Sequence, residues 1–372
     1  MLNGHQVIDA DGHIHDWVID WDIVVPPERR NDAPRPFRDD RGFPRIEVEG
    51  RILPEPDTDE PNVDYRDLQE AMSRFTRDGK YWLPRPGESK AERRLPDMDE
   101  MGIDTAVLFG GHCLMVAAMV EGPAVATTTL RGYNEYLARY CSTDPERLKG
   151  VAMLAMQSPP EAADELRRTV SEYGFVGGVL PPHHANGTTL DDLRLDPIWR
   201  AAEELDVPIC IHTLGTQINP LRTTVKHRNI DDAYGSMPSM IALGHLIMGG
   251  VLDRYPTVDI AFLETGAGWV PYFMDRIQSG YESFTLRAQR LPHDPEEYIR
   301  GDHLYFATEP DEALLPAVVD IIGAERLVLG SDYCHPEGKC PFTMKMLAER
   351  SDISAAVKRK ILFANPARLY RL

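Results

Sequence analysis

The chain has 372 residues, of which 42% are hydrophobic, and it carries a formal net charge of −19. This acidic charge argues against nucleic acid and against an anionic membrane surface as partners, because no basic stripe is present to meet phosphates. No apolar run approaches the roughly 20 residues of a membrane span, and the N-terminus lacks the segments of a signal peptide. We therefore expect a cytoplasmic protein with a full hydrophobic core.

Short apolar runs alternate with longer amphipathic stretches, which is the pattern of repeated strand–helix units. Eight such runs predict strands, at Gln6–Asp11, Thr105–Phe109, Gly150–Ala155, Val176–Leu180, Pro208–His212, Val258–Glu264, His303–Ala307 and Leu327–Asp332. Eight parallel strands are the number that closes a TIM barrel. We therefore predict an α/β fold, a (β/α)8 TIM barrel, formed by a single domain over residues 1–372.

The stretches between these runs predict helices at Pro159–Tyr173, Leu195–Leu205, Pro238–Tyr255, Asp311–Ile322 and Ser351–Phe363. The first of them follows Ser158 and stops at Gly174, residue types that favour the start and the end of a helix.

An insertion at about residues 21–90 follows the first strand and is rich in Pro, Arg and Asp. It has little periodicity apart from a possible helix at Tyr65–Phe75. Because loops after barrel strands leave from the catalytic face, we predict a lid, with a solvated decoration or an oligomer arm as the alternative. A second long connection, Leu214–Gly235, places basic side chains either near a substrate carboxylate or simply on the surface, namely Arg222, Lys226, His227 and Arg228.

Acid and histidine residues gather at the ends of the predicted strands. The first strand region holds Asp9, Asp11, His13 and His15, and His212 and Asp332 end later strands. Imidazole and carboxylate groups bind zinc, manganese and iron, and strand ends on one face of a barrel converge. Side chains alternate along a strand, so the first four residues share one side and their spacing alone does not identify the ligands.

Several motifs appear together in a fixed order along the chain. They are Ile-Asp-Ala-Asp-Gly-His-Ile from Ile8, Leu-Pro-Asp-Met-Asp-Glu-Met-Gly-Ile-Asp from Leu95, Val-Pro-Ile-Cys-Ile-His from Val207, Ile-Met-Gly-Gly-Val-Leu-Asp-Arg-Tyr-Pro from Ile247, Val-Leu-Gly-Ser-Asp-Tyr from Val328, and Asn-Pro-Ala-Arg-Leu-Tyr from Asn365. In this order they resemble the second type of TIM-barrel amidohydrolases, the group that includes aminocarboxymuconate-semialdehyde decarboxylase and the aromatic-acid decarboxylases. The resemblance covers nearly the whole chain.

This resemblance implies a metal site formed by Asp11, His13, His212 and Asp332, with Ile8-Asp9 setting the register so that His15 is a neighbour. The alternative pair on the first strand is His13 and His15. Two-metal members often use a carboxylated lysine on the fourth strand, but no lysine occurs between Gly150 and Val225. We therefore expect one divalent metal ion, zinc in the first place, with manganese or iron as alternatives.

The sixth strand departs from the decarboxylase pattern, because Glu264 stands where those enzymes have a proton-transfer histidine. A partly shielded carboxylate beside a metal can act as an acid or base, so we predict a catalytic role for Glu264. An extra metal ligand and a group that orients His212 are the alternatives. The resemblance also gives Asp332 and His335 catalytic or substrate-contacting roles. His183 and His184 can face the substrate or the surface, and His245 is predicted to be structural within a helix.

The function we predict is metal-dependent, non-oxidative decarboxylation of a small aromatic or unsaturated carboxylic acid. The alternative is hydrolysis of an amide, ester or lactone through a metal-bound hydroxide, with Asp332 accepting a proton. A barrel that binds a metal without catalysis is a third hypothesis, which the intact ligand set disfavours. We expect a small-molecule substrate and a homodimer or higher homo-oligomer.

Overall fold

The parallel strands of the protein form a barrel in the computed structural model, which describes residues 2, 6–53, 85–213, 231–284, 290–333, 335 and 338–372. Hydrogen bonds join the strands in the order β1 (Ile8–Ile14), β5 (Thr105–Gly110), β6 (Leu148–Gly150) and, in a second sheet, β7 (Ala152–Met153), β8 (Gly178–Leu180), β9 (Ile209–His212), β10 (Ile260–Leu263), β11 (Leu304–Ala307) and β12 (Leu327–Val328). Only Val151 separates β6 from β7, so the two sheets are continuous. Buried apolar side chains from these strands fill the core.

Backbone hydrogen bonds also join the first strand to the chain that follows the last one. The Ala10 amide donates to the Leu329 carbonyl at 3.0 Å, and the Asp332 amide donates to the Asp11 carbonyl at 2.9 Å. These bonds bring the two ends of the strand series together. The predicted barrel is confirmed, and each of the eight predicted strands has a counterpart at its expected place in the chain.

Several strands are shorter than predicted, and in two of them the predicted last residue is a site residue that lies outside the strand. β10 stops at Leu263 and β12 at Val328, whereas the predictions extended through Glu264 and Asp332. Glu264 and Asp332 have left-handed backbone conformations, with φ of 54° and 49°, which a strand ladder does not accommodate. Glu264 directly follows β10 and Asp332 lies four residues beyond β12, so their side chains project from the turns after these strands.

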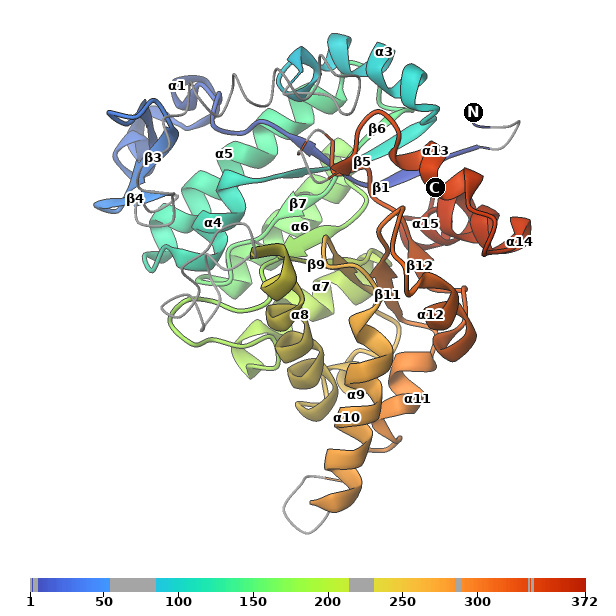
Figure 1. The fold of residues 1–372 in the computed structure, drawn as a ribbon. Helices are drawn as coiled ribbons and strands as arrows, with labels where there is room; N and C mark the ends of the chain where they lie inside the picture. The colour runs from blue at the N-terminus through green and yellow to red at the C-terminus, as the bar shows by residue number, and fades with distance from the viewer. Residues whose placement is uncertain are drawn as a thin grey trace.

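The helices cover the outside of the barrel (Figure 1). They are α3 (Ala91–Met101), α4 (His112–Met119), α5 (Pro123–Cys141), α6 (Pro159–Tyr173), α7 (Asp196–Leu205), α8 (Asp231–Met248), α9 (Val251–Arg254), α10 (Trp269–Ser283), α11 (Pro295–Arg300), α12 (Leu315–Ile322), α13 (Thr343–Glu349), α14 (Ala355–Arg359) and α15 (Asn365–Leu369). In the described part of the chain, none of them is both long and apolar enough to cross a membrane.

The predicted helices differ from the observed ones mainly at their ends. α6 has the predicted bounds and ends at Gly174, whose φ of 66° is the left-handed conformation that favours glycine at this position. The helix predicted from Pro238 to Tyr255 is two helices, because the chain turns at Gly250 with φ of 70°. The predictions from Asp311 and Ser351 start too early, since the helices begin at Leu315 and Ala355.

The described part of the insertion contains a small antiparallel sheet, so the expectation of little regular structure is wrong there. After α1 (Trp21–Val24), the strands β2 (Arg35–Arg38), β3 (Pro44–Val48) and β4 (Arg51–Leu53) pair in sequence. They lie beside α4 and α5 (Figure 1), where the Arg51 guanidinium donates to the Met119 carbonyl at 2.6 Å. Residues 54–84, with the predicted Tyr65–Phe75 helix, lie outside the described residues, and the lid stays a prediction.

Candidate metal centre

The first strand carries its acid and histidine side chains into the barrel, but not with a simple alternation. In the pairing of β1 with β5, Asp9 lies opposite Ala106 and Gly12 opposite Leu108, so β1 has one extra residue there. Such a bulge breaks the period of two and re-aims side chains. The prediction that Asp9 and Asp11 share one side is therefore wrong. The Asp9 carboxylate accepts hydrogen bonds from the Ser331 amide at 2.7 Å and hydroxyl at 2.6 Å, whereas Asp11 faces His13 and His212.

Four predicted ligands converge at the ends of β1, β9 and β12. The His13 Nε2 atom lies 3.6 Å from Asp11 Oδ1 and 3.5 Å from Asp332 Oδ1, and the His212 Nε2 atom lies 3.5 Å from Asp11 Oδ2. Asp11, His13 and His212 are at most 3% exposed. Donor atoms about 2.0–2.2 Å from one ion have separations of this order, so Asp11, His13, His212 and Asp332 fit a single divalent metal.

Hydrogen bonding supports this interpretation. Among the described residues, Asp11 Oδ1, both nitrogens of His13 and the His212 Nε2 atom are buried without a hydrogen-bond partner. Leaving such atoms unsatisfied costs roughly 1–3 kcal/mol each, a cost that a bound ion removes. The His212 Nδ1 atom, in contrast, donates to the Thr213 carbonyl at 2.8 Å. This bond leaves the Nε2 lone pair directed at the cluster, as metal-binding histidines require.

Two further groups reach the same place. The Glu264 Oε2 atom lies 3.1 Å from His212 Nε2 and 3.7 Å from His13 Nε2. His335 places its Nδ1 atom 2.7 Å from Asp332 Oδ1, and its ring stacks on that of His13 with centroids 4.5 Å apart. The His335 side chain is 38% exposed, so it occupies the solvent side of the cluster. The structure thus brings together every residue for which the sequence predicted a catalytic or metal-binding role.

The carboxylates and imidazoles of the cluster shift each other's pKa values. Burial lowers the pKa of His13 well below its usual value, and the neighbouring His335 and His212 add to that effect. Burial alone would also lower the pKa of His212, but the carboxylates of Asp11 and Glu264 outweigh it and raise that pKa to about 9. Burial and the nearby Asp332 raise the pKa of Glu264 well above its usual value. Protons therefore balance part of the carboxylate charge that a divalent ion would neutralise.

A buried network fixes the strands that carry the ligands. The Arg94 guanidinium donates to the His13 carbonyl at 2.8 Å and lies over the Tyr333 ring, 3.7 Å from its centroid. The Tyr333 hydroxyl in turn donates to the Asp97 carboxylate at 2.5 Å. Gly330 allows β1 to lie close to the chain that follows β12, because a Cβ atom at Gly330 would lie 2.5 Å from the Asp11 Cβ atom. α3 thereby holds both His13 and the turn of Asp332 in place.

Other predicted residues lie away from this cluster. His15 places its Nδ1 atom 2.5 Å from the Glu88 carboxylate, and His245, within α8, lies 3.1 Å from Asp191. His183 forms a bridge with Thr189 in the loop after β8. The basic residues Arg222, Lys226, His227 and Arg228 lie outside the described residues.

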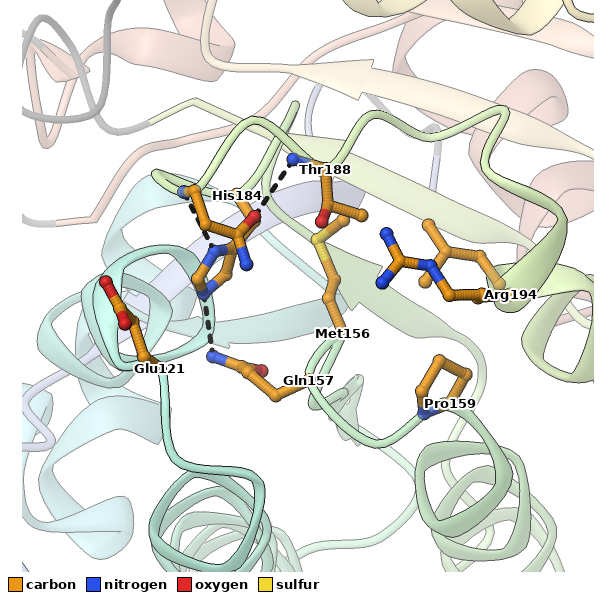
Figure 2. A pocket seen from close by; sticks show the side chains of 9 residues that line it. Glu121, Met156, Gln157, Pro159, His184, Thr188 and Arg194 are labelled. Carbon is orange, nitrogen blue, oxygen red and sulfur yellow. Dashed lines mark hydrogen bonds between the residues drawn. The ribbon is translucent and has the colours of Figure 1, made fainter.

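His184 is a structural histidine. Its Nε2 atom lies 2.9 Å from the Val120 carbonyl, and its Nδ1 atom accepts a hydrogen bond from the Asn186 amide at 3.2 Å. Figure 2 shows it beside Gln157 at the wall of a separate pocket. This pocket lies beyond the ends of β7 and β8 and is lined by Glu121, Met156, Gln157, Pro159, His184, Asn186, Thr188, Arg194 and Leu195.

The sequence did not predict one pair of interacting side chains on the catalytic face, Asp16 and His112. The buried Asp16 carboxylate, two residues beyond β1, accepts hydrogen bonds from the amides of His112 and Cys113 at 3.1 and 2.7 Å. It also lies 3.2 Å from the Nδ1 atom of His112, the first residue of α4. A histidine directly after the Phe-Gly-Gly that ends the second strand was the available clue in the sequence.

The family to which this fold and site belong follows from sequence comparison. The sequence model of one protein family, described as Amidohydrolase, matches residues 8–372. The chain belongs to this family. Gamma-resorcylate decarboxylase from Polaromonas sp. is 29% identical over 298 residues, which cover 76% of this chain and 87% of that protein. This amidohydrolase-family protein is an enzyme, as its relatives are, and the predicted resemblance is confirmed.

Relatives with other activities and solved structures extend the comparison. The 2-keto-4-carboxy-3-hexenedioate hydratase of Sphingobium sp. is 28% identical over 245 residues, covering 63% of this chain and 66% of that one. A variant of 5-carboxyvanillate decarboxylase from Novosphingobium aromaticivorans, solved with bound manganese and 3-methoxy-4-hydroxy-5-nitrobenzoic acid, superposes with a TM-score of 0.72. Its identity is 22%, and the match covers 99% of this chain and 98% of that one, so it supports the barrel fold.

Proposed function

We propose that this amidohydrolase-family enzyme is a metal-dependent, non-oxidative decarboxylase of a small aromatic or unsaturated carboxylic acid. The observation that carries the proposal is the cluster of Asp11, His13, His212 and Asp332. Buried atoms of Asp11, His13 and His212 that have no hydrogen-bond partner among the described residues face one centre that fits a divalent ion. The gamma-resorcylate and 5-carboxyvanillate decarboxylases support the reaction class, and manganese in the latter supports a divalent ion. The comparisons above show manganese and do not show zinc, so they do not support the expectation of zinc.

The residues of the chain suit the proton transfer that decarboxylation needs. A bound ion would supply a positive charge that holds the substrate carboxylate or an adjacent hydroxyl oxygen. Asp332 and His335 lie 2.7 Å apart on the solvent side, close enough to exchange a proton, and can deliver it to the substrate carbon that bears the carboxylate. The bond to the carboxylate carbon then breaks, its electron pair stays with the substrate, and carbon dioxide leaves. No oxidant or reductant enters the balance.

Glu264 is the second acidic group at this centre. Its raised pKa and its 24% exposed side chain are compatible with the predicted catalytic role as acid or base. The position of Glu264 among the ligand atoms also bears on metal binding, which is considered separately below.

Water addition is the second candidate function, and it is favoured by the relationship to the hydratase of Sphingobium sp.. The same buried site could present water to an unsaturated acid or, as the sequence analysis allowed, to an amide, ester or lactone. Asp332 would accept the proton of that water in each case. The products distinguish these reactions, because only decarboxylation releases carbon dioxide.

The experiment is a substrate screen with the full chain after reconstitution with manganese. Hydroxylated benzoic acids test decarboxylation, unsaturated dicarboxylic acids test hydration, and aryl amides and lactones test hydrolysis. We expect carbon dioxide release from at least one hydroxylated benzoic acid and none with His212→Ala. Turnover of only the amides, lactones or unsaturated dicarboxylic acids, without carbon dioxide, would reject the decarboxylase proposal.

We also expect the enzyme to form a homodimer or higher homo-oligomer. Two large side chains, one on α10 and one directly after it, support this expectation, since Tyr272 is 64% and Phe284 is 62% exposed. Light scattering coupled to size exclusion would test it, and the mass of a single chain would contradict it.

A further inference from the structure

We propose that Glu264 is a fifth protein ligand of the metal ion. The inference rests on the proposed metal-dependent function and goes beyond it, because it assigns the coordination sphere and the kind of ion. Glu264 departs from the family pattern at this position, so its assignment as a ligand depends on the geometry of this chain.

The distances around Glu264 match those among the other ligand atoms. Its Oε2 atom lies 3.1 and 3.7 Å from the Nε2 atoms of His212 and His13. The same two nitrogens lie 3.5 and 3.6 Å from the Asp11 oxygens. Ligand atoms about 2.1 Å from one ion at right angles are separated by about 3.0 Å, and a tetrahedral arrangement separates them slightly more. The Glu264 oxygen therefore occupies a ligand position around the same centre.

The hydrogen bonds of His212 argue against an orienting role for Glu264. A carboxylate that orients a metal-binding histidine bonds to the ring nitrogen that is turned away from the ion. In His212 that nitrogen is Nδ1, and it already donates to the Thr213 carbonyl. Glu264 approaches Nε2 instead, the nitrogen that faces the cluster.

The backbone around Glu264 is built to hold this position. Leu263 pairs with His212 across β10 and β9, so Glu264 lies one residue beyond the level of the histidine. Its φ of 54° is a costly conformation for a residue other than glycine, and such strain concentrates at functional sites. The following turn is fixed by Glu312, whose carboxylate accepts a hydrogen bond from the Ala267 amide at 3.1 Å, and by the Trp269 indole, which donates to the Gly266 carbonyl at 2.9 Å.

A fifth ligand changes the character of the site. Asp11, Glu264 and Asp332 give three carboxylates beside two imidazoles, an oxygen-rich set that suits manganese better than a set of nitrogen or sulfur ligands does. Zinc sites in proteins usually have four ligands in all, with three from the protein in catalytic sites. We therefore infer that the resident ion is of the manganese or ferrous type, with at most one position left for substrate in a six-coordinate site.

The test compares manganese binding by the full-length wild type and by Glu264→Ala, Glu264→Gln and Glu264→Asp variants. Affinity would be measured by competition with a chelator, and the ligand field by the electron paramagnetic resonance spectrum of the bound manganese. Glu309→Gln is the matched control, because Glu309 also follows a barrel strand, β11, but lies outside the cluster. Thermal unfolding would verify that each variant is folded.

We expect Glu264→Ala to lose at least about a hundredfold in manganese affinity, the upper range for loss of an outer partner. Glu264→Asp keeps the charge but shortens the reach, so we expect it to weaken binding and change the spectrum too, while Glu309→Gln matches the wild type. Wild-type affinity and an unchanged spectrum in all three Glu264 variants would overturn the inference and leave the metal-dependent function intact. A wild-type chain that binds no divalent ion would instead reject both.

Discussion

Two buried histidines, both at the carboxyl ends of barrel strands, show how differently one residue type can be used. His212, at the end of β9, leaves its buried Nε2 atom without a hydrogen-bond partner in the described chain, beside the carboxylates of Asp11 and Glu264. His184, beyond β8, has both nitrogens within hydrogen-bonding distance of backbone groups. A buried polar atom without a partner is costly, so the first arrangement indicates a ligand and the second a structural residue.

The largest expected effect comes from removing the ligand histidine. His212→Ala deletes the ligand at the end of β9 and should reduce metal affinity by more than about a hundredfold, beyond the loss typical of outer partners. Chelator competition would measure that affinity, and carbon dioxide release should fall to background. Metal retained at wild-type affinity would show that His212 is as structural as His184.

His335 separates proton transfer from metal binding within the same cluster. His335→Gln keeps a polar side chain but removes the titratable ring beside Asp332, so turnover should fall by about a hundredfold or more. Metal content, measured on the same preparation by elemental analysis, should stay at one ion per chain. If the variant loses its metal, His335 is a ligand of the ion, and the separation of proton transfer from metal binding is rejected.

The pH dependence of metal affinity follows from the charge on the cluster. In the metal-free chain the pKa of His212 is raised to about 9, so the ring is protonated below that pH, and an ion must displace the proton. Manganese affinity should therefore fall about tenfold for each pH unit between about pH 8 and 6 from this proton alone. Competition titrations at several pH values would measure the slope. A flat profile would mean that His212 is already neutral, or that it does not bind the ion.

The structural histidine should affect stability and leave the metal untouched. His184→Ala removes two hydrogen bonds and leaves the buried Val120 carbonyl and Asn186 amide with one partner fewer, which should cost about 1–3 kcal/mol in the free energy of unfolding. Denaturant unfolding would measure this cost, and metal affinity on the same sample should match the wild type. A large loss of metal would remove the distinction between the two sites.

The smallest effect is expected at His15, which the sequence placed as an alternative ligand. His15 pairs with Glu88, and its side chain is 30% exposed, so His15→Ala should change metal affinity less than threefold, within about 0.6 kcal/mol. Asp11→Ala is the matched variant from β1, the strand that ends just before His15, and it should lose the metal. Equal losses in both would mean that the Ile8-Asp9 register does not identify the ligands.

The sequence predicted the barrel because short apolar runs and amphipathic stretches repeat along the chain. The order of the strands followed from that repeat, and the family resemblance supplied the four ligands. The sheet of β2 to β4 was not predicted, because its strands are rich in arginine and proline and β2 is exposed along its whole length. A surface strand of this kind has no buried face, and therefore no hydrophobic alternation from which to infer it.

Within the site, the features that the sequence did not predict depend on local backbone geometry and on contacts between distant residues. Period-two alternation put Asp9 beside Asp11, but the bulge in β1 separates them. Gly12 is the kind of residue that marks a bulge, but it does not show where the pairing shifts. The role of His184 depended on contacts with Val120 and Asn186, of which Val120 lies 64 residues away in the chain. The left-handed turns at Glu264 and Asp332 likewise depend on tertiary contacts that a single sequence does not contain.

The most direct test of the account is a crystal structure of the full chain grown with manganese, with anomalous diffraction to locate the ion. The account predicts one strong anomalous peak per chain, within about 2.0–2.3 Å of donor atoms from Asp11, His13, His212 and Asp332. His15 and His184 should keep their contacts with Glu88 and the Val120 carbonyl. A peak at another place, two adjacent peaks, or none at saturating manganese would contradict the assignment of this cluster as a single-metal centre.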